Sequence, residues 1–257
     1  IESYAALACI AIQSNQNDQH GGQSVPNFDY GMAPGVKKTY KKLYLTNLGK
    51  MLDFLEDIDD GVERMKALGA EIEEKHGVCP CMAWDNNYKE LELEELKKIV
   101  PEEEAKKMQD RATKFADKEI RRKTYQAMEA LIHNLNTMHS RAGAQVPFSS
   151  INYGTDTSPE GRLVMESVML ATEAGLGNGE TPIFPIQIFK VKEGVSYNPE
   201  DPNYDLFKLA CRVSAKRLFP NFSFLDAPFN KQYYVDGNPD TECAYMGCRT
   251  RVIGNVY

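Results

Sequence analysis

Apolar residues recur at helical spacing along the first half of the chain. Pro34–Leu55 is predicted as one helix that opens at its proline, because apolar positions follow at intervals of three and four. Residues 1–17 are also predicted as a helix, and their short apolar side chains leave so little polar surface that we expect both sides to pack. Further helices are predicted over Gly61–Lys75 and across residues 90–140, where Pro101 and the glutamates after it favour a helix start.

The pattern changes after residue 140. Phe148–Tyr153 alternates with the period of a strand. Ser158 and Pro159 favour a helix start, and Gly175 a helix end. A strand is predicted next over Thr181–Val191, followed by a helix over Asn203–Leu218 and a short strand over Phe222–Asp226. Residues 227–243 are predicted as a loop, and a final strand carries Met246–Arg249. This alternation predicts an α/β fold with a parallel sheet.

We therefore divide the chain into a helical portion, residues 1–140, and an α/β portion, residues 141–257. The chain starts with Ile1 inside a predicted helix and stops at Tyr257 inside a predicted strand. We expect it to be an internal piece of a longer protein.

Composition narrows the function classes. The 257 residues are 42% apolar and 26% charged, which is ordinary for a soluble globular protein. A net charge of −7 argues against general nucleic-acid binding. No apolar run approaches the roughly 20 residues that span a bilayer, and no signal peptide is present. Without a secretory signal, the six cysteines are interpreted as reduced thiols of a cytoplasmic protein.

The most distinctive stretch lies near the end of the chain. Cys248 stands between a glycine and an arginine, and apolar residues flank it on both sides. Gly247 permits a tight turn, so the pattern predicts a strand, a sharp tip and a strand that present one sulfur to a cavity. Arg249 and Arg251 place positive charge nearby, which favours a thiolate or an anionic ligand.

This stretch, with two earlier motifs, resembles the anaerobic (class III, glycyl-radical) ribonucleoside-triphosphate reductases. The motifs are Leu176–Pro185, Asp201–Asp205 and Met246–Arg249, in that order. The resemblance covers Gln13–Tyr30, Arg141–Asp156 and Glu173–Val252, and it is much weaker between residues 55 and 135.

The resemblance implies a catalytic role for Cys248 as the site of a transient thiyl radical. It also implies that the chain forms part of a ten-stranded α/β barrel with a helical N-terminal portion. The glycyl radical would lie on a glycine outside this chain, made by a radical-SAM activating enzyme, with formate as the reductant. A zinc site is expected only in the missing C-terminal part, so this chain alone should be inactive.

The resemblance further implies ribonucleoside-triphosphate substrates, dNTP or ATP effectors and a homodimer. Substrate-binding residues are then expected at Ser149, Ser150, Asn152, Gly247 and Arg249. Effector-binding residues are expected at Gln16, Gln19 and His20. From the residues alone, the serines and asparagine also fit hydrogen bonding at a strand edge, and the glutamines fit a solvated loop.

Other interpretations stay open. A glycyl-radical enzyme of the formate-lyase type would more often carry adjacent cysteines, whereas Cys243 and Cys248 are five apart. A non-catalytic nucleotide-binding or dimerisation module is the third hypothesis. Cys79 and Cys81 lack the spacing of a zinc site and are interpreted as structural, so no residue is assigned to a metal.

Overall fold

The computed structural model describes residues 1–19, 21–55, 60–139, 145–247 and 250–252. The helices are α1 Glu2–Asp18, α2 Phe28–Leu55, α3 Gly61–His76, α4 Tyr88–Leu96, α5 Glu102–Thr137, α6 Pro159–Ala174, α7 Tyr204–Arg217, α8 Pro228–Lys231 and the 3₁₀ turn η1 Pro239–Thr241. The strands are β1 Gln23–Val25, β2 Ser149–Tyr153, β3 Ile186–Val191, β4 Asn221–Phe224, β5 Ala244–Met246 and β6 Thr250–Val252.

The described chain forms two compact units. One comprises residues 1–34 and 124–257 and holds the strands, and the other comprises residues 35–123 and is helical. Helices α2 and α5 each contribute to both units. The sequence predicted a different division, into a helical portion before residue 141 and an α/β portion after it. That division stays a prediction, because the compact units are defined by contacts and not by secondary-structure class.

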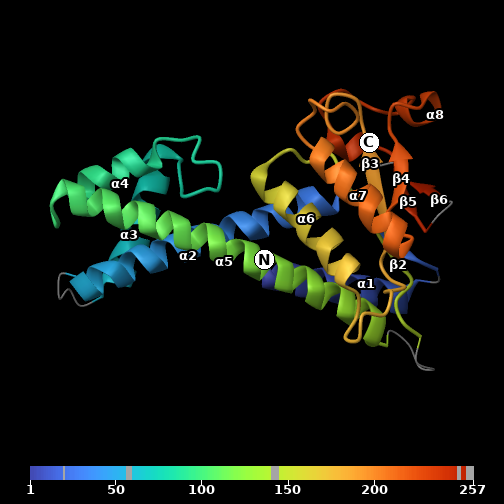
Figure 1. Ribbon diagram of the computed structural model, residues 1–257, viewed down its shortest axis with the longest axis horizontal. Coiled ribbons are helices and arrows are strands. Elements are labelled where there is room, and N and C mark those ends of the chain that lie inside the picture. The colour runs from blue at the N-terminus through green and yellow to red at the C-terminus, as the bar shows by residue number, and fades with distance from the viewer. Residues whose placement is uncertain (20, 56–59, 140–144, 248–249, 253–257) are drawn as a thin grey trace. The chain divides into compact units, whose positions relative to one another are not determined.

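Four parallel strands form the sheet of the first unit, in the order β1-β2-β3-β4 (Figure 1). Helices α6 and α7 connect β2 to β3 and β3 to β4. Connections between parallel strands are almost always right-handed. Because β2, β3 and β4 are neighbours in sequential order, two such connections place both helices on the same face of the sheet. Figure 1 shows α6 and α7 side by side on that face. The α/β fold with a parallel sheet is thus confirmed.

The two faces of this sheet differ in chemistry. On the helix face, Tyr153 and Phe189 meet edge to face, and Phe189 also lies against Phe207 of α7. Gln187 on the same face donates to Thr172 of α6 and accepts from the Tyr153 hydroxyl. Side chains alternate along a strand, so the residues between these positions point to the opposite face, which carries the candidate site.

Most predicted elements are present where the pattern placed them. Helix α6 has the predicted ends: the Ser158 hydroxyl accepts from Gly161 N–H, Pro159 opens the helix, and Gly175 with φ +87° ends it. A strand is present on each side of the predicted tip, and these strands, β5 and β6, pair antiparallel. The final segment is therefore a hairpin rather than one strand.

Two helix or strand starts differ from the prediction. Helix α2 begins at Phe28, so Pro34 lies inside it rather than at its start. Strand β3 begins at Ile186 and not at Thr181, because Pro182 and Pro185 have no N–H for a strand ladder. The N–H groups of Ile183 and Phe184 donate instead to Asn136 Oδ1.

Strand β1 was missed. Its three residues, Gln23–Val25, follow a polar stretch that was predicted as a loop, and they form a strand only by pairing with β2. Helix α1 is present, but it packs on one side only in this chain. Ala5, Cys9 and Ile12 are buried, whereas Leu7 and Ile10 are 62% and 57% exposed.

The helical unit has its own core of buried aromatic and aliphatic side chains. Tyr44 lies edge to face against Trp84, and its hydroxyl donates to the fully buried Glu92. Cys81 accepts a hydrogen bond from the Asn86 amide, and neither Cys79 nor Cys81 forms a disulfide. These contacts agree with a structural role for the pair.

None of the described helices combines the length and the apolar composition that a membrane-spanning helix needs.

Candidate functional site: the polar face of the sheet

The sheet face opposite α6 and α7 is polar, although a parallel sheet usually has apolar residues on both faces. Ser24 of β1, Ser150 and Asn152 of β2, and Lys190 of β3 all point to this side, because the strand register aligns them. Ser150, Asn152 and Lys190 are fully buried. The chain segment from Pro239 to Gly247 covers this face, and each polar side chain bonds to it.

Asn152 binds the middle of strand β5. Its Oδ1 accepts from the Tyr245 N–H at 2.8 Å, and its Nδ2 donates to the Tyr245 carbonyl oxygen at 2.9 Å. The Ser24 hydroxyl donates to the same carbonyl at 2.8 Å. Both backbone polar groups of Tyr245 are therefore satisfied by side chains of the sheet.

Ser150 binds the turn of the hairpin. The Gly247 N–H donates to the Ser150 Oγ at 2.7 Å. Gly247 has φ +63°, a left-handed conformation that favours glycine, and it is buried. The Ser150 hydroxyl on the sheet thus fixes the backbone of Gly247, the residue before Cys248.

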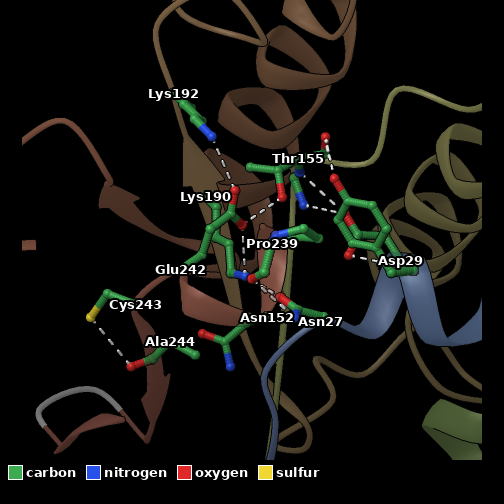
Figure 2. Close-up of polar contacts among 12 residues, drawn as sticks. Asn27, Asp29, Asn152, Thr155, Lys190, Lys192, Pro239, Glu242, Cys243 and Ala244 are labelled. Atoms are coloured by element: carbon green, nitrogen blue, oxygen red, sulfur yellow. Dashed lines mark hydrogen bonds and ion pairs between the residues drawn. The ribbon is translucent and has the colours of Figure 1, made fainter. Parts of the chain in front are cut away.

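Glu242 holds the chain that leads into β5 (Figure 2). Its carboxylate accepts from the Thr155 hydroxyl at 2.8 Å, and it pairs with Lys190 Nζ at 3.2 Å and Lys192 Nζ at 3.3 Å. The Glu242 side chain is 3% exposed. A carboxylate this deeply buried is stable only with such partners.

Asn27 extends the cluster to the turn η1. Its Oδ1 accepts from Lys190 Nζ at 2.6 Å, and its Nδ2 donates to the Pro239 carbonyl at 3.2 Å and to Asp240 at 3.1 Å (Figure 2). The buried ammonium of Lys190 therefore has an acceptor on each side. The same contacts hold the start of the 239–247 segment against the sheet.

Asp29 binds the backbone that follows the carboxyl end of β2. One of its carboxylate oxygens accepts from the N–H groups of Gly154, Thr155 and Asp156 at 2.9–3.1 Å. Complete burial raises the pKa of Asp29, although the Lys190 charge and the backbone donors act against that rise. The contact fixes Thr155, whose hydroxyl reaches Glu242.

Two cavities flank the segment. One of about 260 Å³ is lined by Ile188, Asn221, Phe222, Tyr245 and Gly247, next to the hairpin turn. The other, of about 550 Å³, lies at the carboxyl ends of β3 and β4, where Lys192, Glu242 and Cys243 contribute to its wall. Burial raises the pKa of the Cys243 thiol, so it is not set up as a thiolate.

The structure brings together Ser150, Asn152 and Gly247, three of the residues predicted to bind substrate. Ser149 is separated from them because it belongs to the other face of β2, where its hydroxyl donates to the Pro147 carbonyl. Of the predicted effector residues, Gln16 is buried in the last turn of α1 and Gln19 follows the helix. Cys248, Arg249 and His20 lie outside the described residues.

Sequence reasoning missed Asn27, Asp29, Lys190 and Glu242. Lys190 left a signal, because a lysine within the mostly apolar β3 must find buried partners. Its partner Glu242 lay in a stretch predicted as a loop, where a glutamate is unremarkable. Among the residues that the structure describes, no three His, Cys, Asp or Glu side chains are grouped so as to hold a metal ion.

Comparison with known proteins identifies the family. The family model for anaerobic ribonucleoside-triphosphate reductase matches residues 1–255. The anaerobic ribonucleoside-triphosphate reductase of Escherichia coli K12 is 34% identical over 137 residues, which are 53% of this chain and 18% of that protein. The enzyme of the same name from Enterobacteria phage T4 is 35% identical over 140 residues, which are 54% of this chain and 22% of that protein.

The chain spans about a fifth of the length of these curated relatives. The match to the family model, in contrast, extends over nearly the whole chain. The chain therefore belongs to the anaerobic ribonucleoside-triphosphate reductase family.

Proposed function

We propose that the protein containing this chain reduces ribonucleoside triphosphates to 2′-deoxyribonucleoside triphosphates, and that Cys248 is its thiyl-radical residue. The observation that carries the proposal is the buried anchoring of the 239–247 segment, which ends at Gly247 directly before Cys248. A sulfur that must abstract a hydrogen atom has to be held within a narrow range of positions near the ribose. The sheet supplies that rigidity up to the neighbouring residue.

The proposed chemistry begins at the 3′ carbon of the ribose. The Cys248 thiyl forms an S–H bond while the 3′ C–H bond breaks, and the 2′-hydroxyl takes up a proton and leaves as water. Formate supplies two electrons and, in the net reaction, the hydrogen that replaces the hydroxyl on the 2′ carbon, and it is oxidised to carbon dioxide. The thiol then returns its hydrogen atom to the 3′ carbon. The unpaired electron comes from a glycyl radical, whose glycine lies outside this chain and is activated by a radical-SAM enzyme.

Several parts of the proposal concern the longer protein. The four parallel strands fit one portion of a ten-stranded α/β barrel. A zinc site would lie in the C-terminal part. The cytoplasmic protein would be a homodimer regulated by dNTP or ATP effectors, with Gln16, Gln19 and His20 near the effector. The exposed Leu7 and Ile10 on α1 support a further packing partner for that helix.

Substrate is proposed to lie beside the hairpin turn. Gly247 lines a cavity of about 260 Å³, and this position supports contact between the ribose and the turn. Arg249, two residues after Gly247 in the motif, is proposed to bind the substrate, because a guanidinium is a strong donor to anions such as phosphate. Ser150 and Asn152 contact the hairpin at this turn, whereas Ser149 points to the other face of β2 and is not proposed to contact substrate.

The full-length protein tests the proposal with two serine variants. After anaerobic activation, Cys248→Ser should form the glycyl radical at the wild-type level, measured by electron paramagnetic resonance, but should make no deoxynucleotide. Cys243→Ser is the matched control, because this buried cysteine lies five residues earlier on the same segment. It should retain most of the wild-type turnover.

Deoxynucleotide production by Cys248→Ser above a few per cent of wild type would overturn the assignment. Loss of turnover in both variants, each with an intact glycyl radical, would instead favour a pair of cysteines in the chemistry, as in the formate-lyase alternative. A full-length wild-type protein that binds nucleotides but forms no product would support the non-catalytic module.

A further inference from the structure

The hairpin that carries the catalytic motif is not part of the parallel sheet. Strands β5 and β6 pair only with each other among the described strands, while β1 to β4 form a separate sheet. An isolated two-stranded hairpin is marginally stable in water. Contacts other than a strand ladder must therefore fix its position over the sheet.

Side chains of β2 replace the missing ladder. The planar amide of Asn152 makes two hydrogen bonds to the backbone of Tyr245, one accepted and one donated. A residue of a neighbouring strand would make the same pair of bonds with its own N–H and C=O. The Asn152 amide also donates toward Ser24 Oγ at 3.2 Å and the Val25 carbonyl at 3.3 Å, which restrains its orientation.

The contacts follow one register. Asn152 bonds to Tyr245, and two residues earlier on β2, Ser150 bonds to Gly247, two residues later on the hairpin. Toward the other end, Thr155 meets Glu242. The segment therefore crosses β2 in the opposite direction, residue for residue, as an antiparallel strand would. A shift of this register would move Gly247 and its neighbour together.

We propose that Asn152 and Ser150 are positioning residues that hold the hairpin in the register that places the Cys248 sulfur, rather than substrate-binding residues. This inference rests on the proposed radical role of Cys248. The Asn152 amide is fully buried and its oxygen and nitrogen both bond to the hairpin or β1. The Ser150 hydroxyl is likewise buried and already accepts from the Gly247 N–H.

The first test is Asn152→Asp in the activated full-length protein. The carboxylate keeps the acceptor for Tyr245 N–H, but it loses the donor and faces the Tyr245 carbonyl. We expect wild-type glycyl radical, a KM for the nucleotide within about twofold of wild type, and a kcat at least about tenfold lower, because small misplacements of reacting groups cost that much or more. A side chain that binds substrate would chiefly raise KM.

Asn136→Asp is the matched control. The Asn136 amide also bonds in both directions to one residue, since its Oδ1 accepts from Phe184 N–H and its Nδ2 donates to the Phe184 carbonyl. The substitution therefore repeats the same chemical change at an amide whose hydrogen bonds go to Ile132, Ile183 and Phe184 instead of the hairpin backbone. It should lower the melting temperature while kcat stays near wild type.

The Ser150 pair gives a milder second test, in case Asn152→Asp does not fold. Ser150→Ala leaves the Gly247 N–H without its acceptor and should lower kcat, whereas Ser150→Thr keeps the hydroxyl and should restore much of it. A raised KM with unchanged kcat in Asn152→Asp or Ser150→Ala would overturn the positioning role. Equal loss of glycyl radical and kcat would also overturn it, since the defect would then be one of folding.

The controls separate this inference from the proposed function. If Cys248→Ser remains active, the radical assignment fails whatever the Asn152 variants do. If Cys248→Ser is inactive with its glycyl radical intact, and Asn152→Asp keeps the wild-type kcat, only the positioning role fails.

Discussion

Individual polar residues on this sheet face bind the protein backbone and one another. Lys190 shows the principle: its side chain is fully buried, and its ammonium lies between Glu242 and Asn27. Burying a charge is costly unless opposite charge and hydrogen bonds compensate. Lys190, Glu242 and Asn27 therefore depend on one another, and removing one of them takes a bonded partner away from at least one of the others.

Replacing Lys190 should therefore destabilise the protein strongly. Lys190→Met leaves Glu242 with a buried carboxylate that has lost its nearest fully buried cation, and we expect a loss of about 3–5 kcal/mol in the free energy of unfolding. Urea denaturation of the full-length protein measures the change. Lys231→Met is the control, because Lys231 pairs with Asp226 at the surface with its side chain 54% exposed, and it should cost no more than about 1 kcal/mol.

Glu92 of the helical unit should make stability depend on pH. Burial raises its pKa to about 7, although Tyr44 and Gln109 donate to it. The folded state thus binds this proton more tightly than the unfolded state, whose pKa is about 4.3. The stabilising effect of protonation is complete below the unfolded pKa and is lost as pH rises to about 7.

Glu92→Gln removes this dependence. Between pH 5 and pH 8, the variant should gain about 2 kcal/mol of unfolding free energy relative to wild type. Thermal or urea unfolding at the two pH values measures the difference. The exposed Glu94→Gln should follow the wild-type pH profile, and a Glu92→Gln profile parallel to wild type would contradict the assigned burial effect.

At the scale of elements, patterns that depend on neighbouring residues were predictable. The cap and stop of α6 and the turn at Gly247 follow from local backbone chemistry, and the structure has both. Strand β1 and the true start of β3 were not predictable in this way. Strand β1 has only three residues and is defined by its pairing with β2, which no local pattern shows. The predicted first residues of β3 lie outside the strand, because the N–H groups of Ile183 and Phe184 donate to the Asn136 side chain.

Two glycines of these elements should respond differently to alanine. A Cβ on Gly154 would lie 2.4 Å from the Lys190 carbonyl oxygen, so strands β2 and β3 would have to separate. Among the described residues beyond its chain neighbours, a Cβ on Gly247 would meet nothing closer than 3.5 Å, and its φ of +63° disfavours a side chain. Gly247→Ala should therefore cost about 1–2 kcal/mol of stability and Gly154→Ala clearly more, by urea denaturation. Equal costs would contradict the close approach.

At the scale of the whole described chain, each compact unit has its own core. Met108 is fully buried within the helical unit, and Val164 within the unit that contains the sheet. Local openings in proteins usually follow such cooperative units. The polar face and its covering segment belong entirely to the unit of residues 1–34 and 124–257.

Hydrogen exchange should reveal the two units separately. Met108→Ala creates a cavity that costs about 2–5 kcal/mol, and it should lower amide protection across α3 and α4. Val164→Ala should lower protection in β2 and β3. If either variant lowered protection evenly in both sets of amides, the division into two units would not describe the stability of the protein.

The sequence by itself determined the alternation of strands and helices, both ends of α6 and the motif around Cys248 that led to the family. These features are local, since they depend on spacing and on residues a few positions apart. The tertiary structure alone decided that Asn152 and Ser150 bond to the hairpin backbone, and that Lys190 meets Glu242. Each of these contacts joins residues that are 52 to 97 positions apart, so no local pattern specifies them. They form because sheet register brings these groups together, and because a buried polar group is stable only when it is hydrogen-bonded or paired.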